Sequence, residues 1–119
     1  MNGIILLAHG SRDPKWASPF ERIRAAVESR KPDCVVALAY LEHTIPDFAG
    51  AVDDLVERGA TTGIKVVPLF LGPGGHVRGD VPQLIERASV KHPRLQFDVK
   101  PFVGDARTVL DAIADYAAA

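Results

Sequence analysis

Short apolar runs alternate along the chain with segments in which apolar residues recur every three or four positions. The apolar runs predict strands over residues 4–8, 34–41 and 64–69. Alternation of apolar and polar residues predicts a half-exposed edge strand over 95–99. A helical pattern follows each strand, which is typical of an α/β fold with a parallel sheet.

Capping residues predict where the helices begin. Ser18 can cap the first helix, with Pro19 in the first turn and Glu21 completing a capping box. The corresponding starts of the other helices are residues 44–47, Asp80 with Pro82 in the turn, and Asp105. Gly59 is a natural stop for the second helix.

Each predicted helix carries an apolar stripe that can cover a sheet. The stripes are Phe20, Ile23 and Val27; Phe48, Val52, Leu55 and Val56; Val81, Leu84, Ile85 and Ala88; and Val109, Ile113 and Tyr116. Pro68 cannot donate a ladder hydrogen bond, so it marks the end of the third strand or a bulge. Right-handed crossovers and analogy with doubly wound sheets favour the strand order 2-1-3-4.

Composition adds limits to this picture. The chain has 119 residues, 47% of them hydrophobic and 24% charged, which fits one globular domain over 1–119. The net charge of −1 gives no indication of nucleic acid or an anionic membrane as partner. The single cysteine, Cys34, and a start without a basic leader segment predict a cytoplasmic protein.

Two histidines follow predicted strands. His9 comes directly after the first strand, and His76 lies in a glycine-rich loop after the third. Parallel sheets build their sites at the carboxyl ends of strands, so both imidazoles are expected at one cleft. Neutral imidazole binds Co²⁺, Ni²⁺, Zn²⁺ and Fe²⁺ and can accept a proton near neutral pH. We therefore expect metal ligation, proton transfer or both, rather than two loop-capping histidines.

Other polar groups accompany the histidines. Ser11, Arg12 and Arg78 lie beside them in the sequence, and arginine suits bidentate recognition of carboxylates. Glu42 ends the second strand and can act as an auxiliary base or ligand. His43 is expected to be exposed, and Trp16 and Phe70 are expected in the core. His92 is expected to have no functional role.

The backbone of Gly74 and Gly75 can approach a ligand closely and offer N–H groups to an anion. The loop matches neither a P-loop nor a dinucleotide-binding fingerprint.

Several segments together resemble the CbiX/SirB family of class II chelatases, which insert a divalent metal into sirohydrochlorin. The resemblance rests on Leu-Ala-His-Gly-Ser-Arg-Asp at 7–13, Tyr-Leu-Glu at 40–42, Val-Val-Pro-Leu-Phe-Leu at 66–71, and Gly-Gly-His-Val at 74–77. It covers nearly the whole chain. The order of the two histidine loops on a βα frame is more specific than either loop.

The resemblance implies a chelatase-like, flavodoxin-like three-layer domain and a homodimer, as in the short single-lobe members. It places His9 and His76 at metal-binding, catalytic positions. The metal, Co²⁺, Fe²⁺ or Ni²⁺, would be a substrate, with no tightly bound cofactor. Glu42 would help remove protons, and Ser11, Arg12, Gly74, Gly75 and Arg78 would receive substrate carboxylates.

Two alternatives remain at this point. A non-catalytic tetrapyrrole or metal carrier would use the same pocket without accelerating insertion. A small-molecule anion-binding module would use the glycine loop, with structural histidines. Separate replacement of His9 and His76 distinguishes these from a chelatase.

Overall fold

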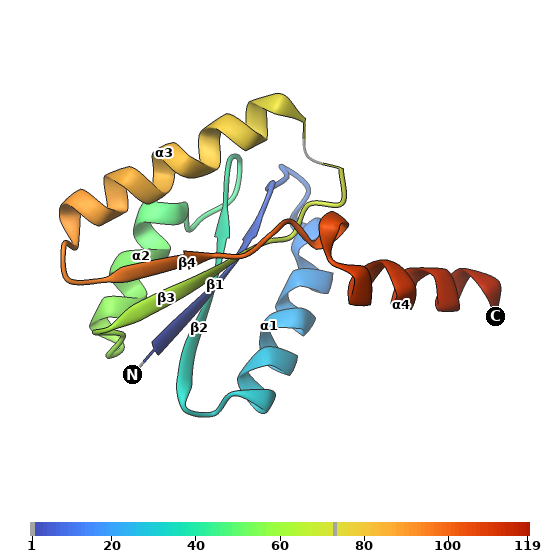
Figure 1. Ribbon diagram of the computed structural model, residues 1–119, viewed down its shortest axis with the longest axis horizontal. Helices are drawn as coiled ribbons and strands as arrows, with labels where there is room; N and C mark the ends of the chain where they lie inside the picture. The colour runs from blue at the N-terminus through green and yellow to red at the C-terminus, as the bar shows by residue number, and fades with distance from the viewer. Residues whose placement is uncertain (1, 73) are drawn as a thin grey trace.

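Four parallel strands form one sheet in the order β2-β1-β3-β4, as predicted. The computed structural model describes residues 2–72 and 74–119, without the side chains of residues 75–78. β1 (Asn2–Ala8) lies between β2 (Cys34–Tyr40) and β3 (Gly63–Pro68), and β4 (Gln96–Val99) is an edge strand. Figure 1 shows this fan of strands with helices packed on both faces.

The strands β2, β1 and β3 end at the same level. In the parallel register, Ala8 lies opposite Tyr40 and Leu7 lies opposite Pro68. Pro68 is the last residue of β3, so the predicted strand end is confirmed. The backbone N–H of Leu69 still donates to the Leu7 carbonyl over 2.8 Å, which keeps the following loop beside β1. The loops after β1, β2 and β3 therefore leave the sheet side by side.

Helices cover the two faces unequally. α1 (Ser18–Arg30) packs on one face, and α2 (Phe48–Glu57) and α3 (Gly75–Lys91) pack on the other. α4 (Arg107–Ala118) follows β4 and projects away from the sheet (Figure 1). Two 3-10 turns, η1 (Pro14–Ala17) and η2 (Val103–Asp105), precede α1 and α4.

Alternate residues of the strands supply two apolar clusters. Ile5, Leu7 and Val66 face α2 and α3, where Phe48 and Leu55 are also buried. On the opposite face, the odd-numbered positions of β3 and the even-numbered positions of β1 face α1. Because β1 is buried on both sides, it reads as a continuous apolar run. Burial of each such side chain contributes roughly 1.5–3 kcal/mol to folding.

The predicted capping box at Ser18 is wrong. Helical backbone begins earlier, at η1, where the Asp13 carboxylate accepts from the Lys15 N–H over 3.0 Å. Ser18 therefore lies inside a continuous helical segment, with no N–H left for its hydroxyl to cap. Glu21 accepts from Arg24 Nε at 2.9 Å instead.

Two further helix starts differ from the predictions. α3 begins at Gly75, so Asp80 and Pro82 lie inside it rather than at its start. Asp105 belongs to η2, and Ala106 is the residue that precedes α4. Pro82 is the eighth residue of α3 and has no N–H, so the helix lacks one i→i−4 hydrogen bond at that position.

The second helix follows the predicted segment, although its cap is Asp47 and not Thr44, whose hydroxyl bonds the Ser11 backbone instead. The Asp47 carboxylate accepts from the Gly50 N–H over 2.8 Å and caps α2. Gly59 has a φ of 109°, a left-handed conformation that favours glycine and stops the helix. The predicted edge strand is also confirmed, since Gln96 and Asp98 are exposed and Phe97 packs against the core.

Candidate functional site

The strand order brings three loops to one edge of the sheet. The loop with His9 follows the central strand β1, the loop with Glu42 follows β2, and the glycine loop follows β3. The strand order reverses here, because β2 lies on one side of β1 and β3 on the other. Open parallel sheets bind ligands at such a switch point, outside the carboxyl ends of the strands.

Hydrogen bonds fasten the β1 loop to the β2 loop. The Glu42 N–H donates to the His9 carbonyl over 3.0 Å. Thr44 Oγ1 accepts from the Ser11 N–H at 3.0 Å and donates to the Ser11 carbonyl at 2.9 Å. Gly10, between these contacts, has a φ of 98°. His9 and Glu42 therefore start from a shared backbone clamp rather than from two independent loops.

The His9 side chain is exposed at this edge and rests on an aromatic support. Its ring centroid lies 4.4 Å from that of Phe70, with 50° between the ring planes. Phe70 is 2% exposed and contacts Phe102, with 5.8 Å between the ring centroids. The core position expected for Phe70 is confirmed. A fixed ring beneath His9 limits the orientations of the imidazole while leaving its nitrogens accessible.

A polar cluster extends from Glu42. Arg12 Nε donates to His43 Nδ1 at 3.2 Å, and His43 Nε2 lies 3.7 Å from Glu42 Oε2. His43 is at the surface, as expected, and adopts a φ of 64°. No local sequence pattern connects His43 with Arg12, which lies 31 positions earlier. Because Nε donates to His43, the terminal nitrogens of Arg12 are the donors that remain for an anion.

The glycine loop leads directly into α3. Gly74 precedes the helix, Gly75 is its first residue, and His76 and Arg78 are its second and fourth. The side chains of His76 and Arg78, both predicted site residues, lie outside the described residues. The first N–H groups of a helix have no partner within it, so this backbone can receive an anionic group.

Among the described residues, no group of three His, Cys, Asp or Glu side chains forms a metal-binding cluster. His9 and Glu42 supply one nitrogen and one carboxylate at the described part of the edge.

Tyr40 ends β2 beneath the clamp. Its side chain is buried and packs with Trp16, with 5.9 Å between the ring centroids. Trp16 in turn lies 4.4 Å from Phe20, so its expected core role is confirmed. Burial raises the pKa of the Tyr40 phenol, which keeps it protonated and makes it a structural group.

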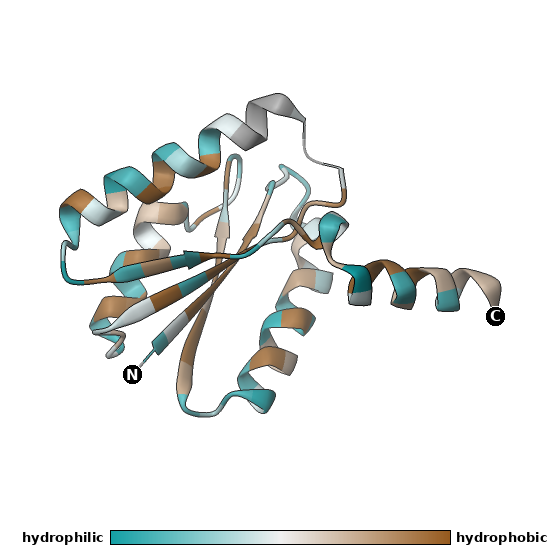
Figure 2. Ribbon diagram, in the orientation of Figure 1, coloured by the Kyte–Doolittle hydropathy of each residue, from teal (hydrophilic) through white to brown (hydrophobic). Residues whose placement is uncertain are grey.

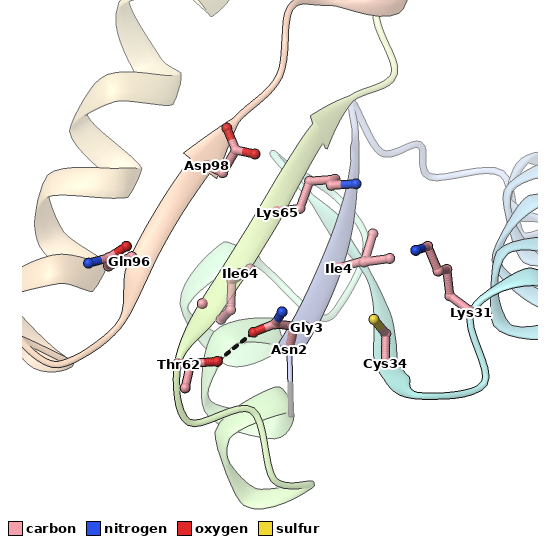
Figure 3. Close-up of a pocket in the computed structure, with 11 residues that line it drawn as sticks. Asn2, Gly3, Ile4, Lys31, Cys34, Thr62, Ile64, Lys65, Gln96 and Asp98 are labelled. Atoms are coloured by element: carbon pink, nitrogen blue, oxygen red, sulfur yellow. Dashed lines mark hydrogen bonds between the residues drawn. The ribbon is translucent and has the colours of Figure 1, made fainter.

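A groove of about 360 Å³ lies at the opposite edge, by the amino ends of the strands (Figure 3). Its lining includes Asn2, Lys31, Cys34, Lys65 and Asp98. It is separated from His9 by the length of β1, so it does not belong to the histidine edge.

His92 makes a structural contact outside the candidate site. Its Nε2 lies 2.9 Å from Asp53 Oδ1, and Lys91 Nζ donates to Asp53 Oδ2 at 2.7 Å. These contacts lower the pKa of Asp53, with the Lys91 hydrogen bond the larger cause. They connect the end of α3 to α2, away from the candidate site. In the described residues no helix is long and apolar enough to cross a membrane.

Comparison with known proteins gives consistent matches. A family model described as CbiX matches residues 3–118. The sirohydrochlorin cobaltochelatase of Methanococcoides burtonii is 33% identical over 84 residues, which cover 71% of this chain and 63% of the relative. This chain therefore spans less than two thirds of that relative's length.

Two solved structures share the fold. A CbiX protein from Marinobacter aquaeolei has a TM-score of 0.85 and 33% identity, covering 99% of this chain and 93% of that one. The sirohydrochlorin chelatase SirB from Bacillus subtilis, in complex with cobalt, has a TM-score of 0.80 and 27% identity. The match covers 99% of this chain and 50% of the SirB chain.

Proposed function

Since this chain belongs to the CbiX family, we propose that it inserts a divalent metal ion, Co²⁺ or Fe²⁺, into sirohydrochlorin. The reaction would occur at the edge where the loops of β1, β2 and β3 leave the sheet. Curated relatives carry the name sirohydrochlorin cobaltochelatase, and SirB structures contain cobalt or Fe³⁺. The Fe³⁺ and cobalt complexes support metal handling by this fold.

One observation of the structure carries the proposal. The His9 loop lies between the Glu42 loop and the glycine loop, because β1 lies between β2 and β3. The Glu42 N–H donates to the His9 carbonyl, so the backbones of the two residues that carry an imidazole and a carboxylate are joined at an exposed edge. His76, in the first turn of α3, follows the other neighbour of β1. These three residues are the proposed catalytic groups, and the two histidines are the proposed metal ligands.

Metal insertion requires that the ion lose water and that two pyrrolic protons leave the macrocycle. In this proposal His9 and His76 hold the ion loosely through nitrogen, since a closed four-ligand site would retain it. As the ion passes to the macrocycle, the freed imidazole and the Glu42 carboxylate accept the departing protons. The tilted ring contact with Phe70 would keep the His9 ring in place through this exchange.

Sirohydrochlorin is rich in carboxylates, and the polar groups around the histidines are proposed to bind them. Arg12 and Arg78 would form charge-assisted hydrogen bonds with these carboxylates. The Ser11 hydroxyl and the backbone N–H groups at Gly74 and Gly75 would receive others. His43 fixes the Arg12 guanidinium through the 3.2 Å contact.

We further propose that the protein is a cytoplasmic homodimer without a tightly bound cofactor. The chain matches half of the SirB chain, so a second copy would supply the other lobe of the cleft. Two-fold dimers are the commonest assemblies of this kind.

The test is an anaerobic absorbance time course of protein, sirohydrochlorin and Co²⁺ or Fe²⁺. Wild type should exceed the protein-free rate. His9→Ala, His76→Ala and Glu42→Gln should each lose about 100-fold or more while retaining much of the tetrapyrrole binding. His92→Gln removes a histidine outside the site and is the matched control. A wild-type rate equal to the protein-free rate with both metals would reject catalysis and favour the carrier.

A further inference from the structure

A groove between α2 and α3 lies apart from the proposed metal site. It has a volume of about 320 Å³ and is on the sheet face opposite α1, where these two helices contact each other (Figure 1). Its described lining contains neither His9 nor Glu42. The volume is at the lower end of the range for small-molecule pockets and is too small for a tetrapyrrole. A ligand of this groove would therefore differ from the proposed substrate.

The floor of this α2–α3 groove is apolar. It is lined by Phe48 and Val52 of α2, by Leu84 and Ala88 of α3, and by Leu41 at the end of β2. Phe48 and Val52 are also core residues, with exposed fractions of 2% and 0%, so the packing of the sheet fixes the floor. Figure 2 shows hydrophobic and hydrophilic residues alternating along α3, as expected for a helix with one apolar side. A ligand that contacts this floor needs an apolar body.

One end of the α2–α3 groove has a positive rim. Lys91 Nζ donates to Asp53 Oδ2 at 2.7 Å, and His92 Nε2 lies 2.9 Å from Asp53 Oδ1, so both carboxylate oxygens are engaged within the rim. Arg87, one helical turn before Lys91, also lines the groove and is exposed. In the part of the chain that the structure describes, no hydrogen bond or ion pair engages the Arg87 guanidinium. Its charge and its N–H donors are therefore available to a ligand.

The other carboxylate of the lining lies away from this rim. Asp47 precedes Asp53 by six residues, which corresponds to about 9 Å along the axis of α2. Its carboxylate accepts from the Gly50 N–H over 2.8 Å and caps the helix. Arg94 lines an adjoining groove that shares Lys91 with this one, so it adds positive charge near the rim. The charge distribution therefore favours an anionic group at the Arg87 end.

We propose that the α2–α3 groove is a binding site for a small organic carboxylate with an apolar body. The Arg87 guanidinium holds the carboxylate through charge-assisted hydrogen bonds, beside Lys91. The apolar body lies on the floor formed by Phe48 and Val52, where burial of its surface adds to the affinity. A carboxylate without an apolar body, or an apolar body without a carboxylate, uses only half of the site.

Titration of isotope-labelled protein with naphthoate, an aryl carboxylate, gives the first test by nuclear magnetic resonance. Amide signals around Ala49, Val52 and Ala88 should shift together and saturate, while those of α1 stay unchanged. Naphthamide has the same rings without the charge and should bind about tenfold more weakly, and acetate should show no saturable binding. The proposal would be overturned by shifts that map outside α2 and α3, by equal binding of naphthamide, or by a dissociation constant for naphthoate above about 1 mM.

Two variants test the two halves of the site. Arg87→Gln removes the charge of an exposed side chain, so it should weaken naphthoate binding about tenfold and leave naphthamide binding unchanged. Ala49 is exposed and lines the groove, so Ala49→Trp should fill its mouth and weaken the binding of both probes about tenfold. Thermal unfolding of each variant shows whether the fold is retained.

Matched controls come from the helix on the opposite face. Arg22 and Ala25 are exposed on α1, so Arg22→Gln and Ala25→Trp should bind both probes as wild type does. If Arg87→Gln bound naphthoate like wild type, or no more weakly than Arg22→Gln, the proposed site would be wrong. Neither metal nor tetrapyrrole enters this experiment, so its failure and the failure of the metal-insertion assay are independent results.

Discussion

Gly10 lies so close to Glu42 that a Cβ atom at Gly10 would stand 1.7 Å from the Glu42 carbonyl oxygen. The φ of 98° at Gly10 also belongs to a region that other residues rarely adopt. The two loops can therefore meet only if this position has no side chain. The proximity of His9 to Glu42 depends on that glycine as much as on the hydrogen bond between them.

Gly10→Ala should consequently separate the two catalytic groups. We expect metal insertion to fall by about 100-fold or more and the free energy of unfolding to fall by about 1–3 kcal/mol. Insertion rates and thermal unfolding measure the two effects. Gly79→Ala is the control, because a Cβ there meets nothing within 4 Å in α3. It should be neutral or slightly stabilising, as alanine favours helix. An active Gly10→Ala would show that the clamp is dispensable.

The Thr44 hydroxyl provides a second way to loosen the clamp. Thr44→Val keeps the shape but removes both contacts with Ser11. It should cost about 1–3 kcal/mol of stability, since the partly buried Ser11 N–H and carbonyl lose their partner. It should also slow metal insertion. Thr44→Ser keeps the hydroxyl and lacks the methyl group, so it should insert metal at nearly the wild-type rate. If the methyl packing were what matters, Thr44→Ser would be slow as well.

Arg12 should act in binding rather than in chemistry. Arg12→Gln removes the charge offered to substrate carboxylates, so KM should rise about tenfold with little change in kcat. Its effect should shrink at high salt, where the wild-type attraction is screened. His43→Ala keeps the charge but releases the guanidinium, so a smaller rise in KM is expected. A fall in kcat with unchanged KM for Arg12→Gln would assign it to the reaction step instead.

The ion pairs of Asp53, which lies away from the candidate site, should make the free energy of unfolding depend on pH. Its pKa is lowered in the folded protein, so its contacts stabilise the fold above the ordinary carboxylate pKa of about 4. This contribution is lost as the pH falls through the lowered value. The Asp53 side chain is 42% exposed, so solvent screening keeps the contribution below about 1 kcal/mol.

Urea unfolding of Asp53→Asn across the acid range measures this effect. The variant should be less stable than wild type at pH 7, and the difference should close at acid pH. Asp33→Asn, at an exposed carboxylate before β2, is the control and should show a smaller difference. If the difference in unfolding free energy between wild type and Asp53→Asn stayed constant down to pH 2, the ion pairs of Asp53 would not be its cause.

Much of the fold could be predicted from local patterns. The apolar runs gave the strands because β1 and β2 are buried on both faces, and Pro68 marked a strand end because it lacks a donor. The starts of α1, α3 and α4 could not be placed from capping residues. In α1 the preceding 3-10 turn, which Asp13 caps and Pro14 begins, supplies helical backbone before Ser18.

The site was only partly visible in the sequence. Strand ends indicated His9, Glu42 and the glycine loop, because parallel strands finish at one edge. The contacts of Ser11 with Thr44 and of Arg12 with His43 join residues more than thirty positions apart, so no local pattern could reveal them. The projection of α4 was equally hidden, because its stripe resembles that of a helix packed on its own sheet.

The central position of β1 has a consequence for how firmly the site is held. β1 pairs with β2 over seven positions and with β3 over five, while both its faces are covered by apolar clusters. Local opening is rarest in such strands, so the amide protons of β1 should exchange most slowly with solvent. His9, one of the two proposed metal ligands, thus follows directly on the most firmly held strand of the described structure. When a bent macrocycle binds, the loops after the strands would change conformation and β1 would stay in place.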